Sequence, residues 1–297
     1  MTSVAESDLE RPDCPLCGPG VAQRLRHSFP PFAAVACVGC GLLFLSPRLV
    51  APRMLERYQG ACYFDSEVAG QGYDEYLAVR ENWLRTFDAR LRVIARHQRA
   101  GRVLDVGCGP GFFLEAAQRR GYEAWGLDPS AYAVELARRA SGDRVRQGVL
   151  ETAPFPAGHF DLLTAFDAFE HVYQPLDFVA AAERLLARDG VLVITTPDPT
   201  SLLARVSGRR WVSFKIPEHV FYWSPATIRR ALAPRFEVLA LTGAGQYATA
   251  GFLLRRLLGL SAPGPRFLRP PLALLNRVSL YANNGSLTVI ARRRSAA

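Results

Sequence analysis

The segment that most constrains the fold of this chain is 102–114, which reads RVLDVGCGPGFFL. Its first part, 103–106, is apolar apart from Asp105 and is typical of a short buried parallel strand. Three glycines follow at alternate positions: Gly107, Gly109 and Gly111. An apolar, alanine-rich helix is expected to begin at Phe112. A strand, a glycine turn and a helix in this order let the backbone approach a ligand closely, with the helix N-terminus directed at it.

The next predicted strand indicates what kind of ligand this is. Residues 123–127 end in Asp128, roughly 20 residues beyond the glycines, where an acidic group can accept hydrogen bonds from both hydroxyls of a ribose. The glycine spacing is G-x-G-x-G, whereas a dinucleotide site requires G-x-G-x-x-G. Asp105 would repel a pyrophosphate but suits an ammonium group. We therefore expect a ligand with a ribose and a cationic amino-acid end.

At these residues the sequence resembles the class I S-adenosylmethionine-dependent methyltransferases, whose first motif is a strand ending in D-x-G-x-G-x-G. The resemblance implies S-adenosylmethionine as the cofactor, with the adenine set against backbone amides near 148–151. The expected cofactor-binding residues are Asp105, Gly107, Gly109, Gly111, Asp128, Leu150, Phe166 and Asp167.

Strands and helices alternate along the rest of the chain, which predicts an α/β fold with a parallel, doubly wound sheet. By resemblance this sheet is Rossmann-like, with seven strands, the last of them antiparallel. The further strands are expected at 144–147, 160–166, 190–195, 235–241 and 286–292, and the helices at 112–120, 131–140 and 176–187. The predicted domains are a zinc-binding module at 1–60, a linking helical segment at 61–100, and an S-adenosylmethionine-binding domain at 101–297 with an insert at 242–284.

Two C-x2-C pairs lie near the N-terminus, separated by 19 residues: Cys14 and Cys17, then Cys37 and Cys40. Such pairs bring four thiolates into the tetrahedron that structural zinc needs, and a glycine follows each pair. A redox pair or a decayed knuckle is the alternative. Four cysteines close the coordination shell, so the predicted Zn²⁺ is structural, not catalytic. Cys62 and Cys108 are interpreted as packing residues.

The segment 40–48, together with Tyr58 and the pair Tyr63-Phe64, resembles a particular subgroup of these methyltransferases. Its members carry a four-cysteine knuckle before the catalytic domain, and many act on sugars or on small metabolites in biosynthetic clusters. The resemblance extends from Cys14 to the last predicted strand.

The formal net charge of +9 comes almost entirely from arginine, since Lys215 is the only lysine among 297 residues. A basic balance can indicate a nucleic-acid partner, but the arginines are spread along the chain, so we favour solvated surface charges and expect no nucleic-acid partner. The first residues show no secretory signal, and no apolar run reaches 18 residues, so a cytoplasmic protein without a membrane span is expected. The oligomeric state stays open.

Two stretches offer chemical groups at the carboxyl end of the predicted sheet. The first, 166–172, contains a Glu-His pair ending in His171, which either borders the cofactor or orders its loop. The second, 216–223, contains Glu218, His219 and Tyr222 among aromatic residues. We predict His219 as the general base or main acceptor-orienting group, with Glu218, Tyr222 and His171 lining the same pocket. Sugar C-methyltransferases of similar layout carry a tyrosine where this chain has Ile216.

Two segments outside the sheet are also predicted. An amphipathic helix at 74–99 should pack on the sheet through an apolar stripe, with its arginines on the opposite, solvated face. The insert contains apolar stretches within 250–280. They indicate either a helical lid over the acceptor pocket, which we favour, or a peripheral contact with a membrane or a lipid-linked substrate.

The leading hypothesis is methyl transfer to a small-molecule acceptor, O- or C-directed, such as a sugar, a glycolipid or a secondary metabolite. The alternative is an RNA methyltransferase that grips RNA through the zinc knuckle. Enzymes that methylate exocyclic base amines place N/D-P-P-Y/F after the fourth strand, whereas residues 166–169 here read FDAF. A non-enzymatic cofactor-binding protein is the third hypothesis.

Overall fold

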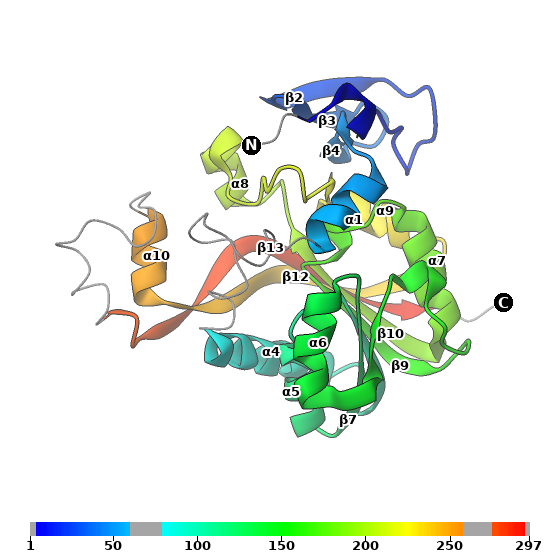
Figure 1. Ribbon diagram of the computed structural model, residues 1–297, viewed down its shortest axis with the longest axis vertical. Coiled ribbons are helices and arrows are strands. Elements are labelled where there is room, and N and C mark those ends of the chain that lie inside the picture. The colour runs from blue at the N-terminus through cyan, green and yellow to red at the C-terminus, as the bar shows by residue number, and fades with distance from the viewer. Residues whose placement is uncertain (1–3, 60–78, 258–274, 295–297) are drawn as a thin grey trace.

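A seven-stranded sheet forms the centre of the fold in a computed structural model that describes residues 4–59, 79–257 and 275–294 (Figure 1). Its strand order is β12-β13-β10-β9-β6-β7-β8. The strands are β6 (Gly101–Val106), β7 (Tyr122–Asp128), β8 (Val145–Gln147), β9 (Phe160–Phe166), β10 (Leu186–Pro197), β12 (Phe236–Thr249) and β13 (Ser279–Arg293). β13 runs antiparallel to both of its neighbours, and the other pairs are parallel. The predicted seven-stranded sheet with an antiparallel last strand is confirmed.

Helices cover both faces of the sheet, because its parallel strands are apolar on both sides. The helices are α4 (Arg80–Ile94), α5 (Phe112–Arg119), α6 (Ala131–Ser141), α7 (Pro175–Leu185), α8 (Leu202–Ser207), α9 (Pro225–Leu232) and α10 (Ala250–Leu257). Along β6 and β9, Val103 and Leu162 pack in the cluster that contains residues of α4, α5 and α6. Leu104 and Leu163, the next residues, enter the cluster that contains residues of α7 and α9. This alternation follows from the two-residue period of a strand.

A smaller, four-stranded sheet forms the N-terminal module, and Figure 1 shows helix α1 (Ala51–Gln59) between it and the large sheet. Its strands are β2 (Gln23–Phe29), β3 (Phe32–Cys37), β4 (Leu43–Leu45) and β11 (Phe221–Tyr222). A two-stranded ribbon, β1 (Leu9–Glu10) and β5 (Arg48–Leu49), lies beside it. β11 comes from the catalytic part of the sequence and pairs with β4. The predicted domain boundaries stay predictions, but the two parts share a sheet.

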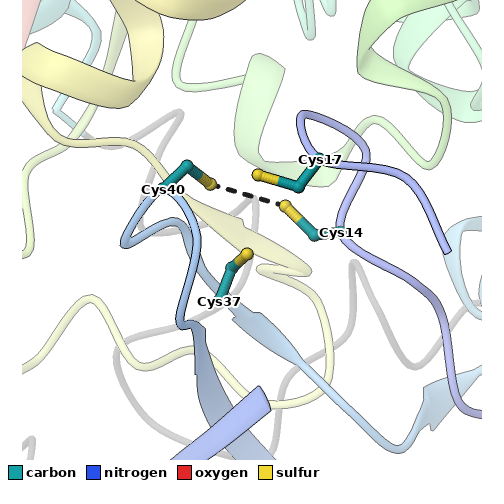
Figure 2. Close-up of side chains that lie close together, drawn as sticks. All are labelled: Cys14, Cys17, Cys37 and Cys40. Atoms are coloured by element: carbon teal, nitrogen blue, oxygen red, sulfur yellow. Dashed lines mark hydrogen bonds between the residues drawn. The ribbon is translucent and has the colours of Figure 1, made fainter. Parts of the chain in front are cut away.

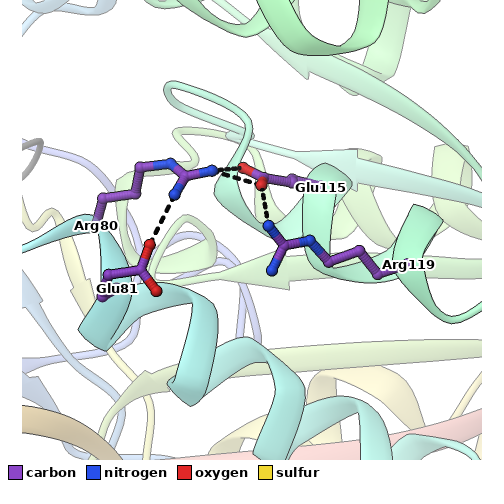
Figure 3. A network of polar contacts seen from close by, with 4 residues as sticks. All are labelled: Arg80, Glu81, Glu115 and Arg119. Atoms are coloured by element: carbon purple, nitrogen blue, oxygen red, sulfur yellow. Dashed lines mark hydrogen bonds and ion pairs between the residues drawn. The ribbon is translucent and has the colours of Figure 1, made fainter.

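A network of charged side chains joins α4 to α5 (Figure 3). Arg80 donates hydrogen bonds to Glu81 and to Glu115, and Arg119 also pairs with Glu115 at 2.6 Å. The side chains of Arg80 and Arg119 are largely exposed, so each pair contributes little to the free energy of unfolding. Apolar contacts lie beneath the network, because Phe87 of α4 and Phe113 of α5 meet edge to face with ring centroids 5.6 Å apart.

Strands β12 and β13 are longer than predicted and continue into the segment expected to be an insert at 242–284. Residues 242–249 and 279–284 belong to these strands, which pair from Phe236 to Thr249. In this extension Thr242 pairs with Thr288 and Thr249 with Ser279, and the side chains of Ala244 and Ala248 are buried. The residues 258–274 lie outside the described part, so the predicted lid or membrane contact at 250–280 falls mostly there. The start of the predicted helix at 74–99 also lies outside it.

Five short 3₁₀ turns complete the part of the chain that the structure describes. They are η1 (Glu6–Asp8), η2 (Gly142–Arg144), η3 (Leu150–Thr152), η4 (Phe169–His171) and η5 (Gly208–Arg210). Over residues 4–59, 79–257 and 275–294, every helix is too short or too polar to cross a lipid bilayer.

Candidate active site

The four predicted zinc ligands converge in the N-terminal module (Figure 2). Their sulfur atoms all lie within 4.8 Å of one another, and the Sγ atoms of Cys14 and Cys40 are 3.5 Å apart. Each knuckle turns in the same way, because the N–H of Gly18 donates to Cys14 and that of Gly41 donates to Cys37. Both glycines have a φ near +79°, a region that favours glycine. The donor set fits structural Zn²⁺.

The glycine turn after β6 lies against the segment that follows β9. Gly107 has a φ of +73°, and a Cβ at this position would come within 2.8 Å of the Cβ of Ala168. Gly111, the N-cap residue of α5, has a φ of +85°, and a Cβ there would come within 3.1 Å of the Cβ of Ala137, a tight contact. The turn therefore needs glycine for both conformation and space, and it places the end of β6 next to the end of β9.

Asp128 ends β7 and is tied to the same turn. Its Oδ2 accepts a hydrogen bond from Gly109 N–H and its Oδ1 accepts one from Ser130 N–H, each at 2.9 Å. Burial raises the pKa of Asp128 to about 6. Each carboxylate oxygen can accept a further hydrogen bond, so the group can receive ribose hydroxyls at a fixed position.

Asp105 is buried within β6 and has Thr164 as its hydrogen-bond donor, with a distance of 2.7 Å between Oγ1 and Oδ1. Burial is the main reason that the pKa of Asp105 is raised to about 7, and the charge of Asp128 raises it further. A bound cation would favour the ionised carboxylate. The place of Asp105 beside an ammonium group stays a prediction.

Arg90 is a residue of this region that the sequence did not predict. It was expected on a solvated face of its helix, but it is 9% exposed and lies over the ring of Phe166, 4.9 Å from the centroid. The reason is its position three residues after Phe87 and one before Leu91, within the apolar stripe of α4. Its three guanidinium nitrogens have no hydrogen-bond partner among the described residues. Asp167 Oδ2 lies 3.7 Å from Arg90 Nη2.

The remaining predicted cofactor-binding residues lie at the same edge of the sheet. Leu150 begins η3 after β8 and is buried. Phe166 ends β9, with its ring centroid 5.0 Å from that of Phe113. Asp167 follows with a φ of +52°, an unusual value for a residue other than glycine, and such strain is common at functional sites. Their contacts with a cofactor stay predictions.

Glu170 and His171 follow Asp167 in the chain and form a cluster with His219, which comes from the segment after β10. Glu170 and His171 belong to η4, and the rings of His171 and His219 meet edge to face with centroids 4.7 Å apart. The Nε2 atom of His219 lies 3.9 Å from Oε1 of Glu170. Backbone contacts hold the two segments together, because Val220 N–H donates to the carbonyl oxygen of Glu170. From the sequence, Glu170 was expected only as the neighbour of His171.

Burial controls the ionisation of this cluster. Burial is the main cause that raises the pKa of Glu170 to about 8, and the nearby charge of Asp167 raises this pKa further. It is also the main cause that lowers the pKa of His171 to about 3 and that of His219 well below its usual value. Lys215 lowers the pKa of both histidines further. Both imidazoles are therefore neutral at pH 7, the form that accepts a proton or binds a metal.

The other predicted acceptor-side residues take different places around the cluster. Tyr222 is buried in β11, with its ring 6.3 Å from that of His219 and 5.0 Å from that of Phe214. Glu218 faces helix α1, where Arg57 donates to its Oε1 at 3.1 Å. Tyr58, in the same helix, has its hydroxyl 2.8 Å from Nδ1 of His171. The structure thus brings His171, His219 and Tyr222 together and leaves Glu218 at the rim.

Comparisons with known proteins show which folds this chain resembles. Two solved S-adenosylmethionine-dependent methyltransferases share the fold. One is from Thermotoga maritima, with a TM-score of 0.50 and 18% identity over 75% of this chain and 95% of that one. The other is from Archaeoglobus fulgidus, with a TM-score of 0.51 and 20% identity over 73% of this chain and 99% of that one.

Similar sequences include ubiquinone biosynthesis O-methyltransferases. The one of Psychrobacter arcticus is 32% identical over 45% of this chain and 59% of its own length. The mitochondrial one of Schizosaccharomyces pombe is 35% identical over 40% of this chain and 44% of its own length. The chain thus spans only about half the length of these relatives. The methyltransferase domain family matches residues 73–235, more than half of the chain. The chain therefore belongs to this family of methyltransferase domains.

Proposed function

We propose that this enzyme transfers the methyl group of S-adenosylmethionine to an oxygen atom of a small-molecule acceptor. The observation that carries the proposal is the cluster of the buried Glu170 and His219 with the half-buried His171, which follows β9 and lies beside the glycine turn. Two neutral imidazoles and a carboxyl group suit an acceptor that must lose a proton. The relatives named as O-methyltransferases support oxygen as the acceptor atom.

The proposed reaction is an in-line displacement. The acceptor oxygen attacks the methyl carbon, the new C–O bond forms as the C–S bond breaks, and S-adenosylhomocysteine leaves. Because the sulfonium is already activated, the protein has to align the two molecules and dispose of the acceptor's proton. We assign alignment of the cofactor to Asp105, Asp128 and the glycine turn. We assign the acceptor side to His219, as general base or orienting group, with His171 beside it.

The surroundings of His219 support oxygen over carbon as the acceptor atom. Ile216 occupies the position where sugar C-methyltransferases of similar layout carry a tyrosine. Tyr222 offers no evident replacement, because its ring packs on Phe214 and its hydroxyl has no hydrogen-bond partner among the described residues. C-methylation requires a base for a carbon-bound proton, whereas a hydroxyl loses its proton more readily.

The test is a methyl-transfer assay with labelled S-adenosylmethionine and a panel of catechols, phenols, nucleotide-linked sugars and total RNA. The expected result is labelled O-methyl ether in a phenol, catechol or sugar, with one S-adenosylhomocysteine formed per product. Product in which the label sits on carbon, or label found in RNA alone, would contradict the proposal.

The buried guanidinium of Arg90 carries a separate prediction about the cofactor. The only anion paired with this guanidinium among the described residues is Asp167, at 3.7 Å, and its nitrogens make no hydrogen bond there, so it can receive a second anion. The carboxylate of S-adenosylmethionine is the anion that this edge of the sheet would receive. Replacing Arg90 by methionine keeps most of the side-chain volume and removes the charge. Losing one charge-assisted contact, worth about 1.5–3 kcal/mol, should weaken cofactor binding roughly tenfold to a hundredfold.

Calorimetric titration with S-adenosylhomocysteine measures this effect. Arg85→Met is the matched control, because Arg85 lies on the exposed face of the same helix, over the ring of Tyr247. It should bind the cofactor as the unmodified protein does. Equal affinities for the two variants would remove Arg90 from the cofactor site.

A further inference from the structure

A cavity of about 420 Å³ lies between the N-terminal module and the segment that follows β10. One wall comes from β2 and from the turn between β3 and β4, and the other comes from α8 and residues 208–214. Its volume is in the range of cavities that hold small molecules. Among the described residues, the lining does not include Glu170, His171 or His219, so the cavity lies apart from the candidate active site.

The charged side chains that line this cavity are all basic. Arg24 and Arg26 lie two positions apart in β2, and both contribute to the wall. The lining residues that the structure describes include no aspartate or glutamate. Arg209 lies close by, because its guanidinium is 5.4 Å from the ring centroid of Phe29, in the same strand as the two other arginines. Three positive charges therefore gather at one side of the cavity.

The protein does not neutralise these charges. Within residues 4–59, 79–257 and 275–294, Arg24, Arg26 and Arg209 form no ion pair with a carboxylate. His27, which also lines the cavity, reports the resulting field: burial lowers the pKa of its imidazole, and the charges of Arg26 and Arg209 lower it further. A concave site lined by charges of one sign concentrates ions of the opposite sign. The cavity therefore favours an anionic ligand.

Trp211 and Phe214 form an aromatic wall of the same cavity. Their rings meet edge to face with centroids 5.3 Å apart, and the ring of Phe214 also lies 5.1 Å from that of His27. Leu43 and Ala204 extend this wall with apolar surface. An apolar lining with a few converging charged groups is typical of a small-molecule site. The two walls together suit a ligand with an anionic end and an apolar or aromatic body.

We propose that this cavity binds a small organic phosphate, with its phosphate group on Arg24 and Arg26 and its organic part against the aromatic wall. The planar guanidinium group matches the oxygen atoms of a phosphate in pairs, which makes arginine the usual residue for this group. A phosphate dianion balances two guanidinium charges, whereas a carboxylate balances one. The phosphate is therefore the anion that fits this charge best.

Aromatic side chains separate this site from the predicted acceptor pocket. The ring of Phe214 lies 5.0 Å from that of Tyr222, and Tyr222 in turn lies 6.3 Å from His219. The cofactor-binding edge of the sheet uses other residues, such as Asp128 and the glycine turn. We therefore expect the organic phosphate and S-adenosylhomocysteine to bind to one chain at the same time.

The test is a calorimetric titration of the full-length protein with phenyl phosphate in the presence of saturating S-adenosylhomocysteine. The saturating ligand occupies the cofactor edge, so that the phosphate cannot bind to the guanidinium of Arg90 instead. The expected stoichiometry is one phenyl phosphate per chain. Arg24→Gln and Arg26→Gln should each weaken its binding about tenfold, the lower end of the range for a hydrogen bond to a charged group. Their affinity for S-adenosylhomocysteine should be unchanged, which shows that both variants are folded.

Arg188→Gln is the matched control, because Arg188 is exposed near the start of β10, whereas the cavity lies beyond the end of that strand. It should bind phenyl phosphate as the unmodified protein does. Inorganic phosphate, which lacks the ring, and benzoate, which carries a single charge, should both bind more weakly than phenyl phosphate. Equal affinity for phenyl phosphate and either probe would overturn the inference. So would the absence of saturable binding, or an affinity that neither arginine variant changes.

Discussion

Replacing His219 by alanine is expected to lower methyl-transfer turnover about a hundredfold to ten-thousandfold, the usual contribution of a positioned acid–base group. The imidazole lies in the buried cluster with Glu170 and His171, so alanine removes the group that we assign to the acceptor. The affinity for S-adenosylmethionine should stay nearly unchanged, because the predicted cofactor residues are different ones. A lower turnover with an unchanged cofactor affinity indicates an interaction made on the acceptor side.

The comparison variant for this experiment is His171→Ala. If His171 mainly orders its loop, this change should weaken cofactor binding or thermal stability more than turnover. The reverse pattern in the two variants would transfer the main acceptor role to His171. Full activity in both would mean that the enzyme works by alignment alone, without help from either histidine.

Replacing Cys37 by alanine is expected to remove one zinc ion per chain and to destabilise the protein. Losing a bound metal is one of the few changes that lower the free energy of unfolding by about 4 kcal/mol or more. For a chain of this size, that loss corresponds to a fall of about 10 °C in Tm. Cys37 is 2% exposed and packs in the same hydrophobic cluster as Phe169 and Trp223. Turnover should therefore fall together with stability, although Cys37 lies outside the catalytic sheet.

Metal analysis of protein purified without added metal, combined with differential scanning calorimetry, measures both effects. Cys108→Ala is the control for zinc content. Cys108 is also buried, but it lies in the glycine turn, away from the four-cysteine cluster. It should keep its zinc. A Cys37→Ala protein with full zinc content and an unchanged Tm would rule out the predicted zinc site.

The sequence predicted the regular parts of this fold because their signals are local. The segment before Gly107 is short, apolar and followed by three glycines, so both the strand and the turn were identifiable. The four cysteines were predicted to converge because C-x2-C pairs form knuckles by themselves. The antiparallel last strand came from family resemblance alone, since no feature of residues 279–293 reveals the direction of a strand.

What the sequence did not reveal depends on contacts between distant segments. β11 joins the module because Phe221 pairs with Phe44, far apart in the chain. The hydrogen bond from helix α1 to His171 depends on where Tyr58 arrives in three dimensions. Arg90 is the exception: its place in the apolar stripe of α4 was visible, but an arginine is normally assigned to solvent. The position of Arg90 in the apolar stripe was the sequence signal that indicated its burial.

The hydrogen bonds of Val220 have a consequence for how proteins of this architecture can be recombined. Its carbonyl oxygen accepts a hydrogen bond from Leu45 in the module, and its N–H donates to Glu170 in η4, the turn that follows strand β9 of the catalytic sheet. Through these two hydrogen bonds, the position of the module determines where Val220 lies, and with it His219, the residue before it. The module therefore cannot be exchanged between related proteins independently of the catalytic part. A chimera that exchanges residues 1–60 without also exchanging 216–223 should fold poorly around His219, so gene fusions and homologous swaps would have to carry both segments as one unit.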